Sequence, residues 1–201
     1  LTRPPRALVC ASATGFYGDR ADELLQESSA SGSGFLADVC QEWEAAAQPA
    51  VRQGIRVAHL RTGMVLSIQG GALAKMLPAF LAGLGGRLGN GRQWMSWISL
   101  EDWVEAAAYV LDTPTLRGPV NLVAPQPVTN REFTKALGRV LGRPTMFPVP
   151  AFVLRLLLGE LADELLLSSV RATPAALLSS GFAFRDPELE GALRSMLGGH
   201  G

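Results

Sequence analysis

The sequence has little charge, no net charge and few residues that commonly bind metals. Among its 201 residues, 18 are Lys or Arg, 18 are Asp or Glu, and 2 are His. The charged fraction of 18% lies below the roughly 25% of an average soluble chain. Balanced charge argues against nucleic acid as the main ligand, and a hydrophobic content of 48% excludes a wholly disordered chain.

Long apolar segments and cysteine pairs are also scarce. The longest uncharged runs, such as residues 62–74, contain glycines and fall short of the roughly 20 apolar residues of a membrane span. No apolar signal-peptide core follows the first residues. Cys10 and Cys40 lie in apolar patterns, so we expect reduced core residues and a cytoplasmic protein. His59 and His200 have no cysteine at ligand spacing, so we expect no metal site.

Strand and helix patterns alternate along the chain, which is typical of an α/β protein with a parallel sheet. From residue 148 the strand signal disappears and a leucine-dense helical pattern covers 152–167. The predicted strands cover 7–11, 55–60, 94–98 and 119–124, and the predicted helices cover 36–47, 71–81, 99–111 and 129–141. The continuous apolar run at 7–11 predicts a strand buried on both faces.

The helix at 36–47 carries an apolar stripe that includes Leu36, Cys40 and Trp43, and Glu44 takes a position on the other face. The glycine-rich segment 83–91 lacks a preceding strand, so it fits a flexible surface loop or a substrate-side loop better than a phosphate cradle.

Candidate functional residues cluster where the predicted strands end. Ser12 follows the first strand and Gly63 follows the second. Ligands of open α/β sheets bind outside the carboxyl ends of the strands, which favours a site here. Two alternatives stay open: Ser12 as a turn serine that bonds its own backbone, and Trp94 with Trp97 as core residues.

Three segments resemble the extended short-chain dehydrogenase/reductases: residues 10–19 (CASATGFYGD), 60–66 (LRTGMVL) and 97–102 (WISLED). Four more segments are similar to an atypical subgroup, the NAD(P)-binding epimerase family proteins. They are residues 43–47 (WEAAA), 70–73 (GGAL), 89–94 (GNGRQW) and 119–122 (PVNL). The leucine-rich tail resembles the C-terminal domain of unknown function in that subgroup.

The resemblance implies the later strands of a Rossmann-like parallel sheet plus a mostly helical C-terminal lobe. Residues 1–147 would form a partial NAD(P)-binding domain with a substrate-side loop at 83–97, and residues 148–201 a helical domain. The chain looks like the C-terminal two-thirds of a family member, without the N-terminal dinucleotide-binding half. The strand at 7–11 would then lie near an exposed edge, through which we expect self-association.

The resemblance also implies roles for single residues. Ser12 would be the hydroxyl that polarises the substrate, and the proton source would be Tyr17, a water or the substrate itself. Gly63, Met64 and Val65 would contact the nicotinamide end of the cofactor, and Arg92 and Trp94 the substrate. The superfamily's Tyr-x-x-x-Lys pair falls on Phe35 and Val39, or on Leu36 and Cys40, which cannot transfer a proton as that pair does.

The resemblance therefore implies an NADP-linked oxidoreductase or epimerase-like protein that transfers hydride at a carbonyl or alcohol carbon of an unidentified small molecule. Absence of the Tyr and Lys pair favours a rival, a non-catalytic protein that binds or senses the dinucleotide. A truncated product without activity is a third reading. We expect this chain alone to bind NADP poorly or not at all, because the phosphate-binding turn belongs to the missing half.

Overall fold

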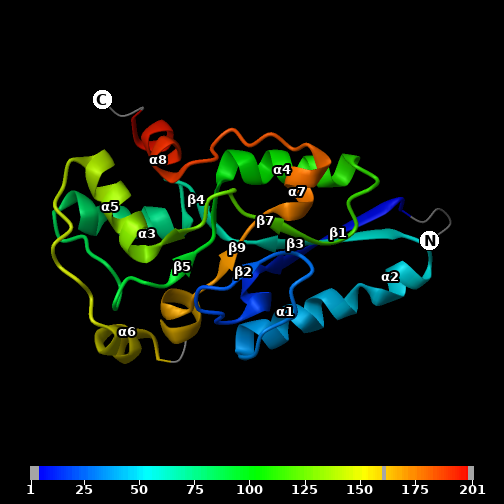
Figure 1. The fold of residues 1–201 in the computed structure, drawn as a ribbon, viewed down its shortest axis with the longest axis horizontal. Helices are drawn as coiled ribbons and strands as arrows, with labels where there is room; N and C mark the ends of the chain where they lie inside the picture. Colours follow the sequence, from blue (N-terminus) through cyan, green and yellow to red (C-terminus); the bar gives the residue numbers. More distant parts are fainter. Residues whose placement is uncertain (1–4, 160–161, 199–201) are drawn as a thin grey trace.

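The protein has an α/β fold built around a parallel three-stranded sheet, as the sequence predicts (Figure 1). The computed structural model describes residues 5–159 and 162–198. Strands β1 (Ala7–Ala13), β3 (Arg56–Thr62) and β7 (Gly118–Leu122) form the sheet in the order β1-β3-β7. Helices α1 (Phe35–Ala46) and α2 (Gln48–Arg52) lie on one side of this sheet, and α4 (Leu100–Asp112) and α7 (Ala175–Ser180) on the other.

Short strands and helices complete the fold. Helices α3 (Gly71–Leu81), α5 (Asn130–Leu141) and α8 (Leu189–Leu197) gather at the end of the molecule away from α2 (Figure 1). The remaining elements are η1 (Thr14–Tyr17), β2 (Leu24–Leu25), β4 (Met64–Leu66), α3 (Gly71–Leu81), β5 (Trp94–Met95), β6 (Trp97–Ser99), β8 (Val128–Thr129), α5 (Asn130–Leu141), α6 (Ala151–Leu158), η2 (Asp163–Leu167), β9 (Arg171–Ala172) and α8 (Leu189–Leu197). Among the described residues, no helix combines the length and apolar character needed to cross a membrane.

Strand β1 forms one edge of the three-stranded sheet and pairs in parallel with β3. The expectation that this strand is buried on both faces is wrong, since Leu8 is 37% exposed and most of its neighbours are only half-buried. A continuous apolar run is typical of a strand with a neighbour on each side. In this structure β1 pairs with β3 alone, so its side chains are more exposed. Self-association through this edge stays a prediction.

Helix α1 is rotated relative to the stripe that the sequence predicts. Trp43 is 55% exposed, whereas Ala37, Cys40 and Ala47 are buried, and Glu44 lies toward the sheet. Hydropathy alone places Glu44 in water, but a buried arginine on β3 gives it an ion-pair partner there. A specific buried partner therefore overrides the apolar pattern.

The C-terminal region is mostly helical and shares its core with the earlier part of the chain. Leu177 of α7 packs in the cluster formed by β3, β7 and α4, and Leu193 of α8 packs in the cluster around α3 and α5. The helix predicted at 152–167 is interrupted: α6 ends at Leu158, and a π-helical turn covers Asp163–Leu167. The strand predicted at 94–98 is likewise two strands, β5 and β6.

Candidate functional site

A row of polar side chains crosses the three-stranded sheet near its carboxyl edge. Ser12 of β1 pairs in register with Arg61 of β3, and Arg61 pairs with Asn121 of β7. Side chains at paired positions of a parallel sheet point to the same face, so the three lie side by side. All three are buried, which is unusual for a Ser, an Arg and an Asn and requires internal partners.

Glu44 of α1 joins two members of this row. Its carboxylate accepts hydrogen bonds from Arg61 Nε at 2.8 Å, from Arg61 Nη2 at 2.9 Å and from Ser12 Oγ at 2.8 Å. The side chains of Arg61 and Glu44 are only 4% and 14% exposed. Burial by itself raises the pKa of Glu44, but the hydrogen bonds from Arg61 and Ser12 and the charge of Arg61 outweigh it and hold the pKa below its usual value.

Tyr17 of η1 closes the other end of the row. Its hydroxyl donates to Asn121 Oδ1 at 2.7 Å and accepts from Arg61 Nη1 at 3.1 Å. The residue is fully buried, and burial raises the pKa of its hydroxyl. The glycines that flank Tyr17 suggest a loosely placed loop residue. This expectation is wrong, because hydrogen bonds to Asn121 and Arg61 fix the hydroxyl of Tyr17. Its hydroxyl has no exposed surface from which to reach a substrate.

Ser12 lies within β1, so the alternative of a turn serine bonded to its own backbone is wrong. A hydroxyl has one hydrogen, and that of Ser12 already points at Glu44. In this arrangement Ser12 presents only lone pairs to a ligand. Phe16 covers the row, with its ring centroid 3.4 Å from the Arg61 guanidinium carbon.

Gly63, Met64 and Val65 continue from the carboxyl end of β3 into β4. The backbone at Gly63 passes very close to the segment before β6, because an added Cβ would lie 2.6 Å from Ser96 O and 2.8 Å from Val123 Cγ1. Met64 N donates to the same Ser96 oxygen at 2.8 Å. Met64 and Val65 are half-buried and pack against the two main apolar clusters.

Arg92 and Trp94 do not join the polar row. Arg92 is exposed. Trp94 is half-buried, its Nε1 donates to Asp22 Oδ1 at 2.9 Å, and Arg171 of β9 lies over its ring at 4.2 Å. Ser96 connects this region to Gly63: its carbonyl faces Gly63 and Met64, while its hydroxyl donates to Val170 O and accepts from Ala172 N.

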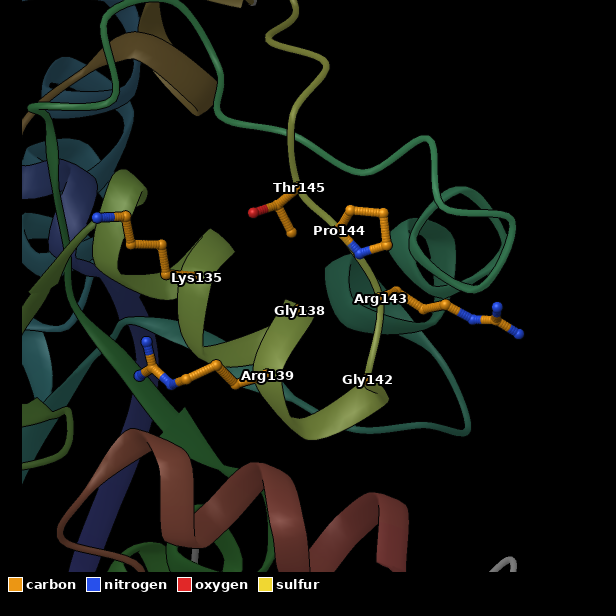
Figure 2. A pocket seen from close by; sticks show the side chains of 7 residues that line it. All are labelled: Lys135, Gly138, Arg139, Gly142, Arg143, Pro144 and Thr145. Atoms are coloured by element: carbon orange, nitrogen blue, oxygen red, sulfur yellow. The ribbon is translucent and has the colours of Figure 1, made fainter.

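One cavity lies away from the polar row, and another reaches it. A shallow one of about 350 Å³ is lined by α5 and the segment after it, and Figure 2 shows the Arg143 side chain directed away from Lys135 and Arg139, so the three cations do not converge. A larger one of about 980 Å³ runs beside α1 and reaches His59 and Glu44. Burial lowers the pKa of His59, and its Nδ1 has no partner among the described residues.

Sequence reasoning missed Arg61, Glu44, Asn121 and Arg171. A signal was present for two of them: Arg61 and Asn121 interrupt the apolar runs of β3 and β7, where a polar side chain must find a buried partner. Glu44 and Arg171 carry no comparable signal, because their partners come from elements far away in the sequence. Within residues 5–159 and 162–198, no group of three potential metal ligands comes together.

Comparison with known proteins places these features in context. The domain of unknown function DUF1731 matches residues 149–196. "Epimerase family protein MT2273" of Mycobacterium tuberculosis is 50% identical over 186 residues, which cover 92% of this chain and 62% of the relative. "Epimerase family protein SDR39U1" of Bos taurus is 34% identical over 197 residues, covering 97% of this chain and 67% of the relative.

A solved structure matches nearly the whole chain. The crystal structure of human epimerase family protein SDR39U1 (isoform2) with NADPH has a TM-score of 0.91 and 32% identity, and the match covers 98% of this chain and 66% of the human one. The crystal structure of a nucleoside-diphosphate sugar epimerase from Corynebacterium glutamicum has a TM-score of 0.77 and 39% identity. That match covers 96% of this chain and 38% of the bacterial one. The chain thus spans about 62% of the length of the mycobacterial relatives it matches.

Proposed function

The chain belongs to the epimerase family of these relatives, and from that premise we propose that it forms the nicotinamide and substrate side of an NADP-linked oxidoreductase or epimerase-like protein. The proposed reaction is hydride transfer at a carbonyl or alcohol carbon of a small molecule. The observation that carries the proposal is the match over 98% of the chain to a human relative crystallised with NADPH.

The residues at the carboxyl edge fit the nicotinamide end of such a cofactor. Gly63 lets the backbone turn tightly against Ser96, and the half-buried side chains of Met64 and Val65 offer an apolar surface to a planar ring. Gly70 and Gly71 join β4 to α3 without the G-x-G-x-x-G spacing that pyrophosphate binding uses. Bound dinucleotide would supply the hydride chemistry, and these residues would orient its ring.

Ser12 has a narrower proposed role than the resemblance implies. The pKa of Glu44 is held below its ordinary value, so the carboxylate is ionised near neutral pH and the Ser12 hydroxyl keeps donating its hydrogen bond to it. Ser12 would then accept a hydrogen bond from a substrate hydroxyl rather than donate one to a carbonyl. Tyr17, Asn121 and Arg61 would keep this edge rigid without touching the substrate.

Methyl NMR on the 201-residue chain tests cofactor binding. With methionine methyl groups labelled and Met64 assigned through Met64→Leu, NADPH should shift the Met64 signal saturably. The exposed Met146 serves as the internal control, because it lies outside the proposed contact. Affinity should be weaker than low micromolar, and reduced nicotinamide mononucleotide should bind about as well as NADPH. An unchanged Met64 signal at saturating NADPH contradicts the proposal.

A second candidate function, a non-catalytic dinucleotide-binding protein, rests on α1. Residues 35–46 contain neither Tyr nor Lys, and the hydroxyl of Tyr17 is buried. Transfer of deuterium from 4-deuterated NADPH to a panel of aldehydes and ketones, measured by mass spectrometry on the full-length relative, separates the two. Deuterium in an alcohol product supports the enzyme, and binding without transfer supports the second candidate.

A further inference from the structure

A groove of about 980 Å³ runs along the face of the sheet that α1 and α2 partly cover. Val57 and His59 of β3 form its floor together with Pro119 of β7, which pairs in register with His59. Alternate residues of a strand point to the same face, so these side chains lie on the side of the sheet where Arg61 meets Glu44. The volume lies within the roughly 300–1,000 Å³ of small-molecule sites.

This groove is a different place from the proposed nicotinamide contacts. The described residues that line it do not include Gly63, Met64 or Val65, and it extends to the amino ends of β3 and β7, where Gly54 and Gly118 line it. The free edge of β1 lies at the opposite edge of the three-stranded sheet from β7. A chain that continues the sheet at β1 therefore does so away from the groove.

His59 is a polar group on the floor of the groove, and it has no partner there. It is 6% exposed, and neither ring nitrogen is hydrogen-bonded to another described residue. Burial lowers the pKa of His59 below its ordinary value, so at pH 7 the ring is uncharged, with one N–H donor and one lone-pair acceptor. An unpaired buried polar group is costly. A hydroxyl in the groove both donates and accepts, so it would satisfy the ring in either tautomer.

The end of the groove at the amino ends of β3 and β7 is positive. Arg56 and Arg117 line it, and neither forms an ion pair with a carboxylate of the described residues. Arg56 donates to backbone carbonyls of α4 and the segment after it, whereas Arg117 is exposed. Glu44, an acidic lining residue, is paired with Arg61. One free guanidinium suits a singly charged carboxylate better than a phosphate, whose further oxygens need more donors.

We propose that this groove binds a small amphipathic acid, a molecule with a carboxylate at one end, an apolar body and a hydroxyl at the other end. The carboxylate pairs with Arg117, the hydroxyl pairs with His59, and the body packs between them. The apolar side chains that the body contacts are Val51, Ile55, Val57, Pro114 and Pro119. The site is additional to the proposed function and does not depend on it.

Histidine ring NMR on the 201-residue chain tests the site without cofactor or turnover. The chain has two histidines, so labelled histidine gives two ring signals, which either His59→Gln or His200→Gln assigns. Titration with 4-hydroxyphenylpropionate should shift the His59 signal saturably. Phenylpropionate lacks the hydroxyl and should bind more weakly. The neutral 4-hydroxyphenylpropionamide should bind about tenfold more weakly than the acid, the loss typical of a hydrogen bond to a charged group.

Two arginine substitutions show whether the charge that matters is the one in the groove. Arg117→Met should weaken binding of 4-hydroxyphenylpropionate about tenfold, because it removes the cation that pairs with the carboxylate. Arg52→Met is the matched control and should leave the affinity unchanged, since Arg52 is an exposed cation of α2 that does not line the groove. Both side chains are exposed, and thermal melts check that both variants are folded.

The outcomes that overturn the site are specific. They are a His59 signal that no probe shifts saturably, equal affinities for the acid and its amide, equal affinities with and without the hydroxyl, and equal effects of Arg117→Met and Arg52→Met. A saturable shift that weakens with loss of the carboxylate, of the hydroxyl and of Arg117 supports it.

Discussion

Two arginines of this protein lie over aromatic rings, and their surroundings are opposite in kind. Arg61 stacks on Phe16 and donates to Glu44, Tyr17 and the Glu27 carbonyl. Arg171 stacks on Trp94, and its side chain has a single, long hydrogen bond to the described residues. The first cation is enclosed by several partners, whereas the buried Nε of the second has no partner among the described residues.

The difference separates a satisfied polar network from a buried donor that the described residues leave unsatisfied. Buried polar groups of folded proteins are almost always paired, so a satisfied network holds a structure together, while an unpaired donor needs another explanation. Arg61 donates to partners in α1, in η1 and in the segment after β2. Arg171 has a buried Nε without a partner among the described residues. If this comparison is right, the two sites respond in opposite ways to mutation.

The largest effect is expected for Arg61→Met. Removing the guanidinium leaves the nearly buried Glu44 carboxylate without its partner, which should lower the free energy of unfolding by about 3–5 kcal/mol. Urea denaturation measures it. Arg139→Met, which breaks the exposed pair with Glu190, is the matched control and should change stability far less. Equal effects of the two substitutions would contradict the scaffold role.

Acid should weaken the same network from the Glu44 side. The folded pKa of Glu44 lies below its ordinary value of 4.5, so its stabilising contribution is fully present above pH 4.5. It is lost as the pH falls from there through the lower folded pKa, because protonation removes the charge that Arg61 binds. Unfolding free energies between pH 2 and pH 6 should therefore fall less steeply in Glu44→Gln than in the unmodified chain.

Tyr17→Phe should cost less than the loss of Arg61. The change keeps the buried ring but leaves Asn121 Oδ1 without the hydroxyl that donates to it, an effect of about 1–3 kcal/mol. Urea denaturation measures the loss. Tyr109→Phe, which removes a half-buried hydroxyl bonded to the Ser180 carbonyl, is a comparison outside the row. An unchanged midpoint in Tyr17→Phe would show that the hydroxyl does not support the row.

The smallest effect is expected for Arg171→Met. A side chain of similar length replaces a buried donor that has no partner among the described residues, so the free energy of unfolding should change by less than about 1 kcal/mol, in either direction. The stability curve is measured under the same conditions as for Arg61→Met. If Arg171→Met lowers the free energy of unfolding as much as Arg61→Met does, Arg171 stabilises the fold as Arg61 does. The proposed difference between the two arginines would then be wrong.

Local patterns predicted most of the secondary structure. The helix at Gly71–Leu81 has the predicted bounds, and α5 starts one residue after its predicted start, behind a capping box of Thr129 and Glu132. The sequence also predicted that the candidate functional residues lie at the carboxyl edge of the strands. It missed Glu44 because hydropathy treats an acidic side chain as solvated, and it misjudged Tyr17 because flanking glycines suggest mobility.

The sequence by itself determined the α/β pattern, the family and the strand ends where chemistry is expected, because these depend on spacing along the chain. Only the tertiary structure decided that Glu44 faces Arg61, that the Ser12 hydrogen is already used, and that Arg171 lies over Trp94. Each of these contacts joins residues from separate elements, and hydrogen-bond partners depend on register and helix rotation, which no local pattern encodes.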